Sequence, residues 1–279
     1  MSNDKVILTC AVSLLTLLVG YVGYVALTAK KYVYRSKIAK LVIYPIKSLP
    51  GVQVDHLDIL PSWCKYKNFR DRSWILLDDS NRMITLRNEP LLSKIIITLL
   101  EDEIRLEADG MPPIKIPNQQ PLKKGDLIHT VDIWEQEIAG QDCGKEINDW
   151  FSQYLQKNCK LIKHHDVFGY RGSKVIVKDE LHKKRGKNMD ILYQDGAPIL
   201  MMNEKSVQDL NKRIRDDHGD ENPAEIGSDR FRPNIFFETD KALEEDTWKF
   251  VKINDAEFQF LGEFFSAWAS QKNRSSICN

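Results

Sequence analysis

An uninterrupted apolar segment near the N-terminus places the strongest constraint on how this chain folds. The residues from Val6 to Leu27 include no charged side chain, and about 20 apolar residues suffice for a helix to cross the core of a bilayer. Five basic residues follow the segment between Lys30 and Lys40, whereas Lys5 alone is basic before it. This asymmetry predicts a transmembrane anchor over residues 6–27, with the rest of the chain facing the cytosol.

A cleaved secretory signal is the alternative interpretation of the same segment. No A-x-A-like cleavage site precedes Lys30, and the apolar run is longer than the hydrophobic region of a typical signal peptide. We therefore expect a signal anchor that stays attached to the chain.

Charge and cysteine content narrow the class of protein. The 279 residues carry 40 basic and 40 acidic side chains, so no net charge attracts a polyanion and we expect no nucleic-acid partner. The five cysteines are odd in number and form no C-x-x-C pair. This argues against a disulfide framework or a zinc site and suits a reducing compartment. The part beyond the anchor is long enough for two small domains.

Short apolar runs bounded by turn residues follow the anchor, which is the pattern of a β-rich domain. A helix is predicted over Lys145–Leu155 from its apolar spacing, with Asp142 as a candidate N-terminal cap, and a second over Ser206–Ile214. The fold class is therefore α+β and β-rich. The predicted strands are Ala39–Tyr44, Val52–Ile59, Ser73–Asp78, Met83–Leu86, Lys94–Leu100, Glu103–Ala108, Lys160–Ile162, Pro198–Met202, Asn234–Glu238 and Phe250–Phe260.

Motifs for the common enzyme classes are missing from the sequence. It contains no Walker loop, no G-x-G-x-x-G, no H-E-x-x-H and no Ser-His-Asp motif. The adjacent His164 and His165 would point to opposite faces of a strand, so they do not share a metal. We assign no metal ligand and no catalytic residue from these patterns.

Basic and small polar residues at turns are the remaining candidates for chemistry. Lys47 and Ser48 follow the first predicted strand, and an ammonium beside a hydroxyl suits a phosphate oxygen. Arg72 leads into another strand, and Arg232 and Asn234 open a third. Guanidinium groups bind anions in a bidentate manner, but an exposed lysine or a surface Arg–Asp pair is the commoner explanation of each motif alone.

At these residues the sequence resembles the mitochondrial amidoxime-reducing components, which belong to the MOSC (molybdenum cofactor sulfurase C-terminal) superfamily. The resemblance runs from about Ile38 to about Leu261. It is carried by the stretches IYPIKSLPGV at 43–52, NFRDRSWIL at 68–76, MITLRNEP at 83–90, GQDCG at 140–144, APILMMNEKSVQDLN at 197–211 and FRPNI at 231–235.

The resemblance implies an N-terminal MOSC β-barrel-like domain over residues 38–165, packed on an incomplete MOSC domain over 166–262. It also implies a molybdenum–molybdopterin cofactor between them. The family's cofactor-binding positions fall here on Lys47, Ser48, Arg72, Arg232 and Asn234. A Thr-Ser pair that the family offers to the cofactor falls on Gly196 and Ala197, so backbone amides replace two hydroxyl groups.

The activity implied by the resemblance is reduction of N-hydroxylated compounds. Electrons would come from cytochrome b5 and NADH-cytochrome b5 reductase. The location implied is the outer mitochondrial membrane, with the endoplasmic reticulum as the alternative.

The stretch 263–279 does not resemble the family. The family carries a molybdenum-ligating cysteine beyond the strand that matches Val251–Leu261, and no equivalent is assigned here because Cys278 lies in a polar tail. The alternative to a reductase is therefore a catalytically impaired, MOSC-like binding module or a truncated isoform. In a sulfurase-type protein Cys143 would be the reactive thiol, although a buried structural thiol is the simpler expectation for it.

Overall fold

The computed structural model describes residues 13–24, 32–172, 190–218, 224–260, 266–269 and 275–278. Backbone contacts divide the chain into two compact units, residues 1–35 and 36–279. Each unit is described by itself.

The prediction of a transmembrane helix is not supported by the described residues of the first unit. Of the predicted anchor over residues 6–27, the described part is a helix over 13–24, and the remainder lies outside the described residues. No helix in the described ranges is long and apolar enough to cross a membrane. A span needs about 20 residues at 1.5 Å of rise each, and the described helix is shorter than that.

A seven-stranded sheet dominates the second unit, and it joins strands from both ends of the chain. Strand β1 pairs antiparallel with β2 on one side and with β16 on the other, whereas β15 and β16 are parallel. The two predicted domains therefore contribute strands to one sheet. In spatial order its strands are β17 (Phe250–Ile253), β18 (Ala256–Phe260), β19 (Ser266–Ala269), β15 (Ile199–Asn203), β16 (Ile235–Phe237), β1 (Ile38–Ile43) and β2 (Val52–Val54).

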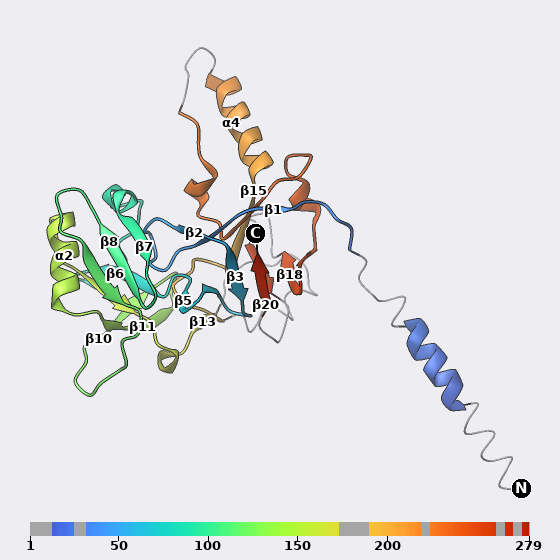
Figure 1. The fold of residues 1–279 in the computed structure, drawn as a ribbon, viewed down its shortest axis with the longest axis horizontal. Helices are drawn as coiled ribbons and strands as arrows, with labels where there is room; N and C mark the ends of the chain where they lie inside the picture. The colour runs from blue at the N-terminus through green and yellow to red at the C-terminus, as the bar shows by residue number, and fades with distance from the viewer. Residues whose placement is uncertain are drawn as a thin grey trace, which may run out of the picture. The chain divides into compact units, whose positions relative to one another are not determined.

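Two smaller sheets and a helix form the part of this unit that is green in Figure 1. Helix α2 (Lys145–Leu155) has the predicted bounds, and it buries Ile147, Trp150, Phe151 and Leu155 as its apolar spacing requires. One sheet has the order β10 (Ile128–Asp132), β11 (Glu137–Asp142), β12 (Cys159–Lys163) and β6 (Trp74–Asp78). The other consists of β7 (Ile96–Leu99), β8 (Glu103–Glu107) and β9 (Ile114–Pro117).

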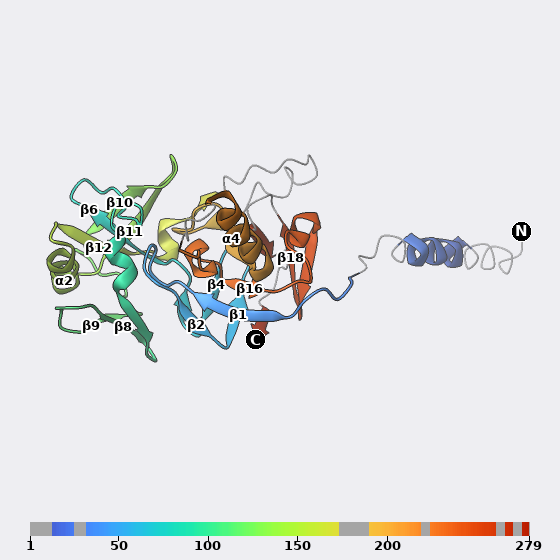
Figure 2. The same cartoon turned by 90° about the horizontal axis from the view of Figure 1, so that it is seen from above.

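The remaining elements complete the unit around the large sheet. Helix α4 (Glu204–His218) follows β15 directly, as Figures 1 and 2 show. A four-stranded sheet has the order β20 (Ser275–Cys278), β3 (His56–Ile59), β4 (Cys64–Tyr66) and β5 (Phe69–Arg70), and β13 (Arg171–Gly172) pairs with β14 (Asp190–Ile191). The 3-10 helices are η1 (Pro90–Lys94), η2 (Asp166–Phe168), η4 (Ser228–Phe231) and η5 (Glu244–Thr247).

The β-rich α+β class is confirmed, and several local predictions are corrected. Met83–Leu86 is not a strand: Met83 forms an isolated antiparallel bridge with Leu77, and a turn follows at residues 86–88. The Asn88 side chain stabilises this turn by accepting from the Thr85 backbone N–H at 2.7 Å. Gly144 rather than Asp142 precedes helix α2 as its cap. The predicted strand Phe250–Phe260 is the hairpin β17–β18, which turns at Asn254 with φ 50°.

The stretch 263–279 contributes two strands. Strand β19 lies between β18 and β15 in the large sheet, and β20 pairs with β3 along four residues. Ile277 of β20 is fully buried in the main hydrophobic core. The part of the chain that we expected to be unlike the family thus supplies an interior strand of the large sheet and an edge strand of the four-stranded sheet.

Candidate cofactor-binding site

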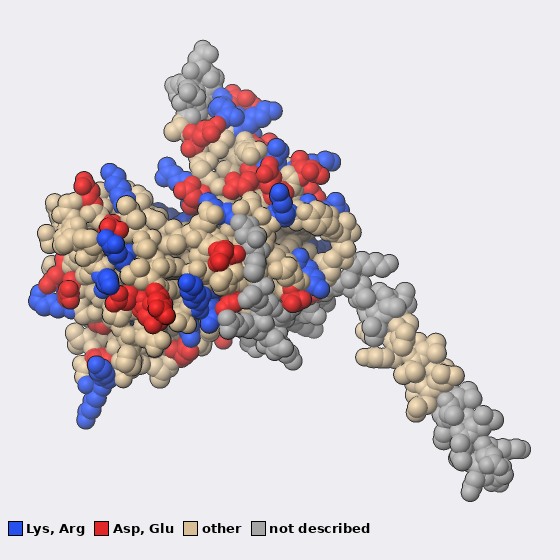
Figure 3. Space-filling view, in the orientation of Figure 1, with Lys and Arg blue, Asp and Glu red and all other residues tan. Residues whose placement is uncertain are grey.

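A cavity of about 530 Å³ lies in the second unit. Its wall contains five basic side chains and one acidic side chain, whereas basic and acidic groups are mixed over the surface face drawn in Figure 3. Such an excess of donors with positive charge favours an anionic ligand. The charged residues of the wall are Lys47, Arg72, Arg87, Arg230, Arg232 and Asp195.

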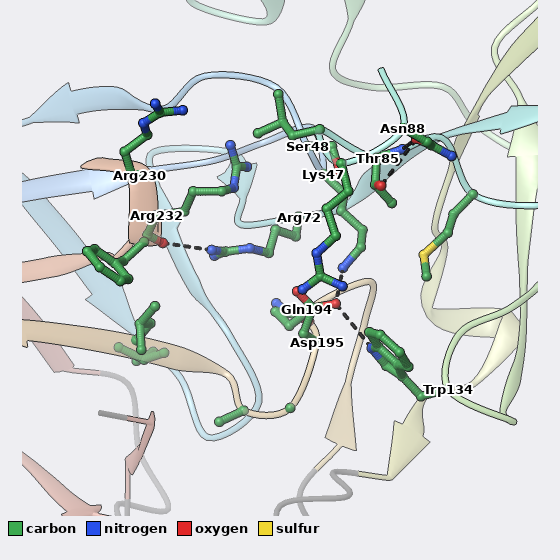
Figure 4. A pocket seen from close by; sticks show the side chains of 18 residues that line it. Lys47, Ser48, Arg72, Thr85, Asn88, Trp134, Gln194, Asp195, Arg230 and Arg232 are labelled. Atoms are coloured by element: carbon green, nitrogen blue, oxygen red, sulfur yellow. Dashed lines mark hydrogen bonds and ion pairs between the residues drawn. The ribbon is translucent and has the colours of Figure 1, made fainter. Parts of the chain in front are cut away.

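Lys47 is held at the cavity by a short turn after β1. Its backbone N–H donates to the carbonyl of Trp74 at 2.8 Å, and its Nζ donates to the Tyr193 carbonyl and to Asp195 Oδ1, both at 2.7 Å (Figure 4). Burial lowers the pKa of Lys47 to about 8, and the Asp195 carboxylate opposes that shift. Lys47 therefore still carries its charge at neutral pH.

Arg72 is fixed by a buried ion pair. Its guanidinium donates to Asp71, which is completely buried, and to the Arg232 carbonyl at 2.9 Å. Burial works against the charge, but the Asp71 carboxylate raises the pKa of Arg72. The alternative of a surface Arg–Asp pair is thus wrong at this position, because the pair is buried.

Arg232 comes from the opposite end of the chain and shares an aromatic platform with Arg72. The Tyr44 ring lies 4.4 Å from the Arg232 guanidinium and 4.8 Å from that of Arg72. Arg232 Nη1 donates to the Leu49 carbonyl at 2.5 Å, whereas its buried Nη2 has no acceptor within the described residues. Burial and then the neighbouring Arg72 lower the pKa of Arg232 to about 10. A buried donor without an acceptor costs about 1–3 kcal/mol, which a bound ligand would recover.

Asn234 lies behind this cavity rather than on its wall. It is fully buried, and its Nδ2 donates to Asp71 Oδ1 at 2.9 Å and to the Val42 carbonyl at 3.3 Å. Its Oδ1 accepts from Arg72 Nη1 at 3.3 Å. The geometry makes Asn234 a brace that orients Asp71 and Arg72.

Three predicted site residues have a left-handed backbone. The φ angles are 68° at Ser48, 49° at Arg72 and 59° at Arg232, in a region that side chains other than glycine rarely adopt. Such conformations persist where the surrounding structure imposes them, and they gather at functional sites. The structure thus brings Lys47, Ser48, Arg72 and Arg232 to one cavity, with Asn234 against it.

The sequence analysis did not identify Trp134 or Asp195 as part of this site. Trp134 lies at a hairpin tip between β10 and β11, is 45% exposed, and donates from Nε1 to Asp195 Oδ1 at 3.2 Å. Asp195 stands directly before Gly196 and Ala197, which also line the cavity. Asp195 could have been identified from the sequence, because it directly precedes the position of the family's Thr-Ser pair. No such feature of the sequence indicated Trp134.

Three buried cysteines do not form part of the cavity wall. Cys64, Cys143 and Cys159 are buried and unpaired, and burial raises the pKa of each thiol above its ordinary value. A thiol with a raised pKa is a poor nucleophile. Cys143 is therefore a structural thiol.

This donor-rich cavity is walled by residues from both halves of the second unit, and each half matches a MOSC family model. The MOSC N-terminal beta barrel domain matches residues 35–158, and the MOSC domain matches residues 188–264. The chain therefore belongs to the proteins that combine these two domains. Lys47, Ser48 and Arg72 lie within the first match, and Arg232 lies within the second.

Within that class, the chain is similar to the mitochondrial amidoxime reducing components. It is 33% identical to component 2 of Rattus norvegicus over 223 residues, which cover 80% of this chain and 62% of that protein. For component 2 of Homo sapiens the identity is 32% over 79% of this chain and 62% of that protein. The chain is 28% identical to component 1 of Homo sapiens, over 80% of this chain and 62% of that protein. The match thus spans about three fifths of each relative.

Proposed function

We propose that the basic cavity binds the phosphate-bearing pterin of the molybdenum cofactor, and that the protein is an oxidoreductase that reduces N-hydroxylated compounds. One observation carries the proposal. Lys47, Arg72 and Arg232 line one cavity, and the buried Nη2 of Arg232 has no acceptor among the described residues. A ligand that offers several acceptor oxygens fits such a donor set.

Each residue of the cavity has its own role in binding the cofactor. The Lys47 ammonium, the Ser48 hydroxyl and the Arg72 guanidinium would donate to the phosphate, and Arg232 would donate to the pterin ring. Asn234 would act indirectly, since its amide holds Asp71 and Arg72. Gly196 and Ala197 offer no side-chain donor. The cofactor, when bound, supplies the two electrons that cleave an N–O bond.

The names of the similar proteins support the substrate class and the location. We propose N-hydroxylated substrates, electrons from cytochrome b5 and its NADH-dependent reductase, and a mitochondrial location. The outer mitochondrial membrane, rather than the endoplasmic reticulum, remains the sequence prediction for the compartment. Fractionation of organelles with marker proteins for both membranes tests it.

A second function is favoured by the cysteines. The buried thiols of Cys64, Cys143 and Cys159 do not line the cavity. A binding module that holds the pterin without turnover is consistent with that finding.

The test is to purify the full chain, quantify pterin by fluorescence after oxidation, and quantify molybdenum by mass spectrometry. Turnover is then measured with benzamidoxime, cytochrome b5, its reductase and NADH. Stoichiometric pterin and molybdenum with turnover support the reductase. Pterin without turnover supports the binding module.

Variants link the result to the cavity. The substitutions K47Q and R72Q should each reduce pterin affinity by roughly 10- to 100-fold, because a hydrogen bond to a charged group contributes about 1.5–3 kcal/mol. Lys94 is exposed and lies outside the cavity wall, so K94Q is the matched control. A wild-type chain without pterin, or equal losses in K47Q and K94Q, would contradict the proposed site.

A further inference from the structure

A second cavity, of about 470 Å³, adjoins the first. The two share Leu86, Arg230 and Arg232 as wall residues. The floor of the second cavity is formed by one face of β1 and by Tyr44, which follows β1 directly, because Lys40, Val42 and Tyr44 alternate along the chain and therefore point to the same side. Of its residues, Arg232 alone has a part in the function proposed above.

The charges of this second cavity are unbalanced. It has three basic side chains, Lys40, Arg230 and Arg232, against the single carboxylate of Asp229. In the first cavity, Lys47 and Arg72 form ion pairs with Asp195 and Asp71. None of the three basic groups of the second cavity forms an ion pair with a described residue. Unpaired cations that converge on one cavity favour a bound anion.

Contacts with neighbouring groups hold two of the three cations at the cavity. The Lys40 Nζ lies 4.2 Å from the centre of the Phe236 ring, a contact that holds the ammonium above the floor without neutralising it. Arg232 is anchored through Nη1 at the Leu49 carbonyl, and its Nη2 lacks an acceptor in the described part of the chain. Arg230 is exposed and lines both cavities.

Gln53 and Ser93 add polar side chains to the wall, and the remaining part of it is apolar. Val42, Pro50, Leu86 and Pro90 line it. Gly51 approaches β1 so closely that a β-carbon there would lie 2.4 Å from Val42 Cγ1 and 2.5 Å from a carbon of the Tyr44 ring. An apolar body of small size therefore fits between this wall and the three cations, with its anionic group toward the cations.

We propose that the second cavity is a separate binding site for a small phosphate monoester, in which Lys40, Arg230 and Arg232 hold the phosphate and the apolar wall holds the ester group. Arg230 and Arg232 line both cavities, whereas Lys40 lines the second cavity and not the first.

Phenyl phosphate, inorganic phosphate and the uncharged benzyl alcohol are the probes. Each is titrated into the purified full chain by calorimetry. We expect phenyl phosphate to bind more tightly than inorganic phosphate and benzyl alcohol not to bind. Equal affinities for the two phosphates would overturn the assignment of the apolar wall, and no binding of phenyl phosphate at millimolar concentration would overturn the site.

The variant K40Q separates this site from the first cavity, whose wall does not include Lys40. It should weaken phenyl phosphate binding by roughly tenfold, the equivalent of one hydrogen bond to a charged group, and leave pterin content unchanged. K37Q, which removes an exposed charge outside both cavities, should change neither. K47Q should reduce pterin content and retain phenyl phosphate binding.

Thermal unfolding of each variant verifies that it is folded. If K40Q and K37Q weakened phenyl phosphate binding equally, the ligand would be attracted by the charged surface in general and the proposed site would be wrong. Loss of phenyl phosphate binding in K47Q with none in K40Q would place the anion in the first cavity. Since pterin content and phenyl phosphate affinity are measured separately, a failure of the proposed function does not decide this inference.

Discussion

Substitution of Asp71 by alanine should destabilise the second unit more than any other single change at the site. The carboxylate is fully buried, and it accepts from the Tyr44 backbone N–H and from Asn234 Nδ2, both at 2.9 Å, as well as from the Arg72 guanidinium. Its removal leaves the charge of Arg72 buried beside that of Arg232. Arginine keeps its proton at any accessible pH, so the charge cannot be relieved by titration.

The magnitude follows from that uncompensated charge. Removal of one partner of a buried ion pair costs about 3–5 kcal/mol, and a unit of this size loses roughly 2–4 °C in Tm per kcal/mol. We expect D71A to lower the free energy of unfolding by about that amount and the Tm by roughly 6–20 °C. Urea and thermal unfolding of the full chain, followed by tryptophan fluorescence, measure both quantities.

The matched control is D195N. Asp195 also pairs with a buried cation, but its side chain is 70% exposed, and Lys47, with its pKa lowered to about 8, can lose its proton at modest cost. A pair of this kind contributes about 0–1 kcal/mol. A loss below about 1 kcal/mol in D71A, or an equal loss in D195N, would refute the reasoning.

Three further predictions concern pH, thiol reactivity and packing. Between the folded pKa of Lys47, about 8, and its ordinary value of 10.5, the unfolded state binds more protons, so the contribution of Lys47 to stability should rise with pH across this window. Denaturant titrations at several pH values, beside K47M, measure that contribution, and an unchanged slope in K47M would contradict it. The thiols of Cys64, Cys143 and Cys159 should resist maleimide in the native protein because burial raises the pKa of each; peptide mass spectrometry that finds native labelling would disprove their inertness. G140A should destabilise by about 1–3 kcal/mol, since its β-carbon would lie 2.4 Å from Tyr193 Oη, whereas G172A, with open space around it, should be neutral in the same unfolding assay.

Local patterns in the sequence were sufficient for the class of fold and for one helix. The spacing of Ile147, Trp150, Phe151 and Leu155 predicted helix α2 with its observed bounds, because the periodicity of an amphipathic helix is a local property. Alternating and apolar runs likewise identified β1, β6, β8 and β12 to within a few residues. The resemblance to the MOSC family, which the comparisons confirm, rested on short motifs whose order is also read directly from the chain.

Interactions between distant segments escaped that analysis. The pairing of β1 with β16 and of β3 with β20 joins residues about 200 positions apart, and no local periodicity encodes it. No helix of the described residues is long and apolar enough for the span predicted over 6–27, and the turn after Thr85 involves the side chain of Asn88.

At the site, the sequence by itself determined which residues are suited to bind an anion, since charge and hydrogen-bonding groups belong to each side chain. Only the tertiary structure decided what each residue does with them. It buries Asp71 against Arg72, withdraws Asn234 behind the cavity, adds Trp134 and Asp195, and leaves Arg232 Nη2 without an acceptor among the described residues. The physical reason is that partners, burial and the resulting pKa of a group depend on segments that meet only when the chain is folded.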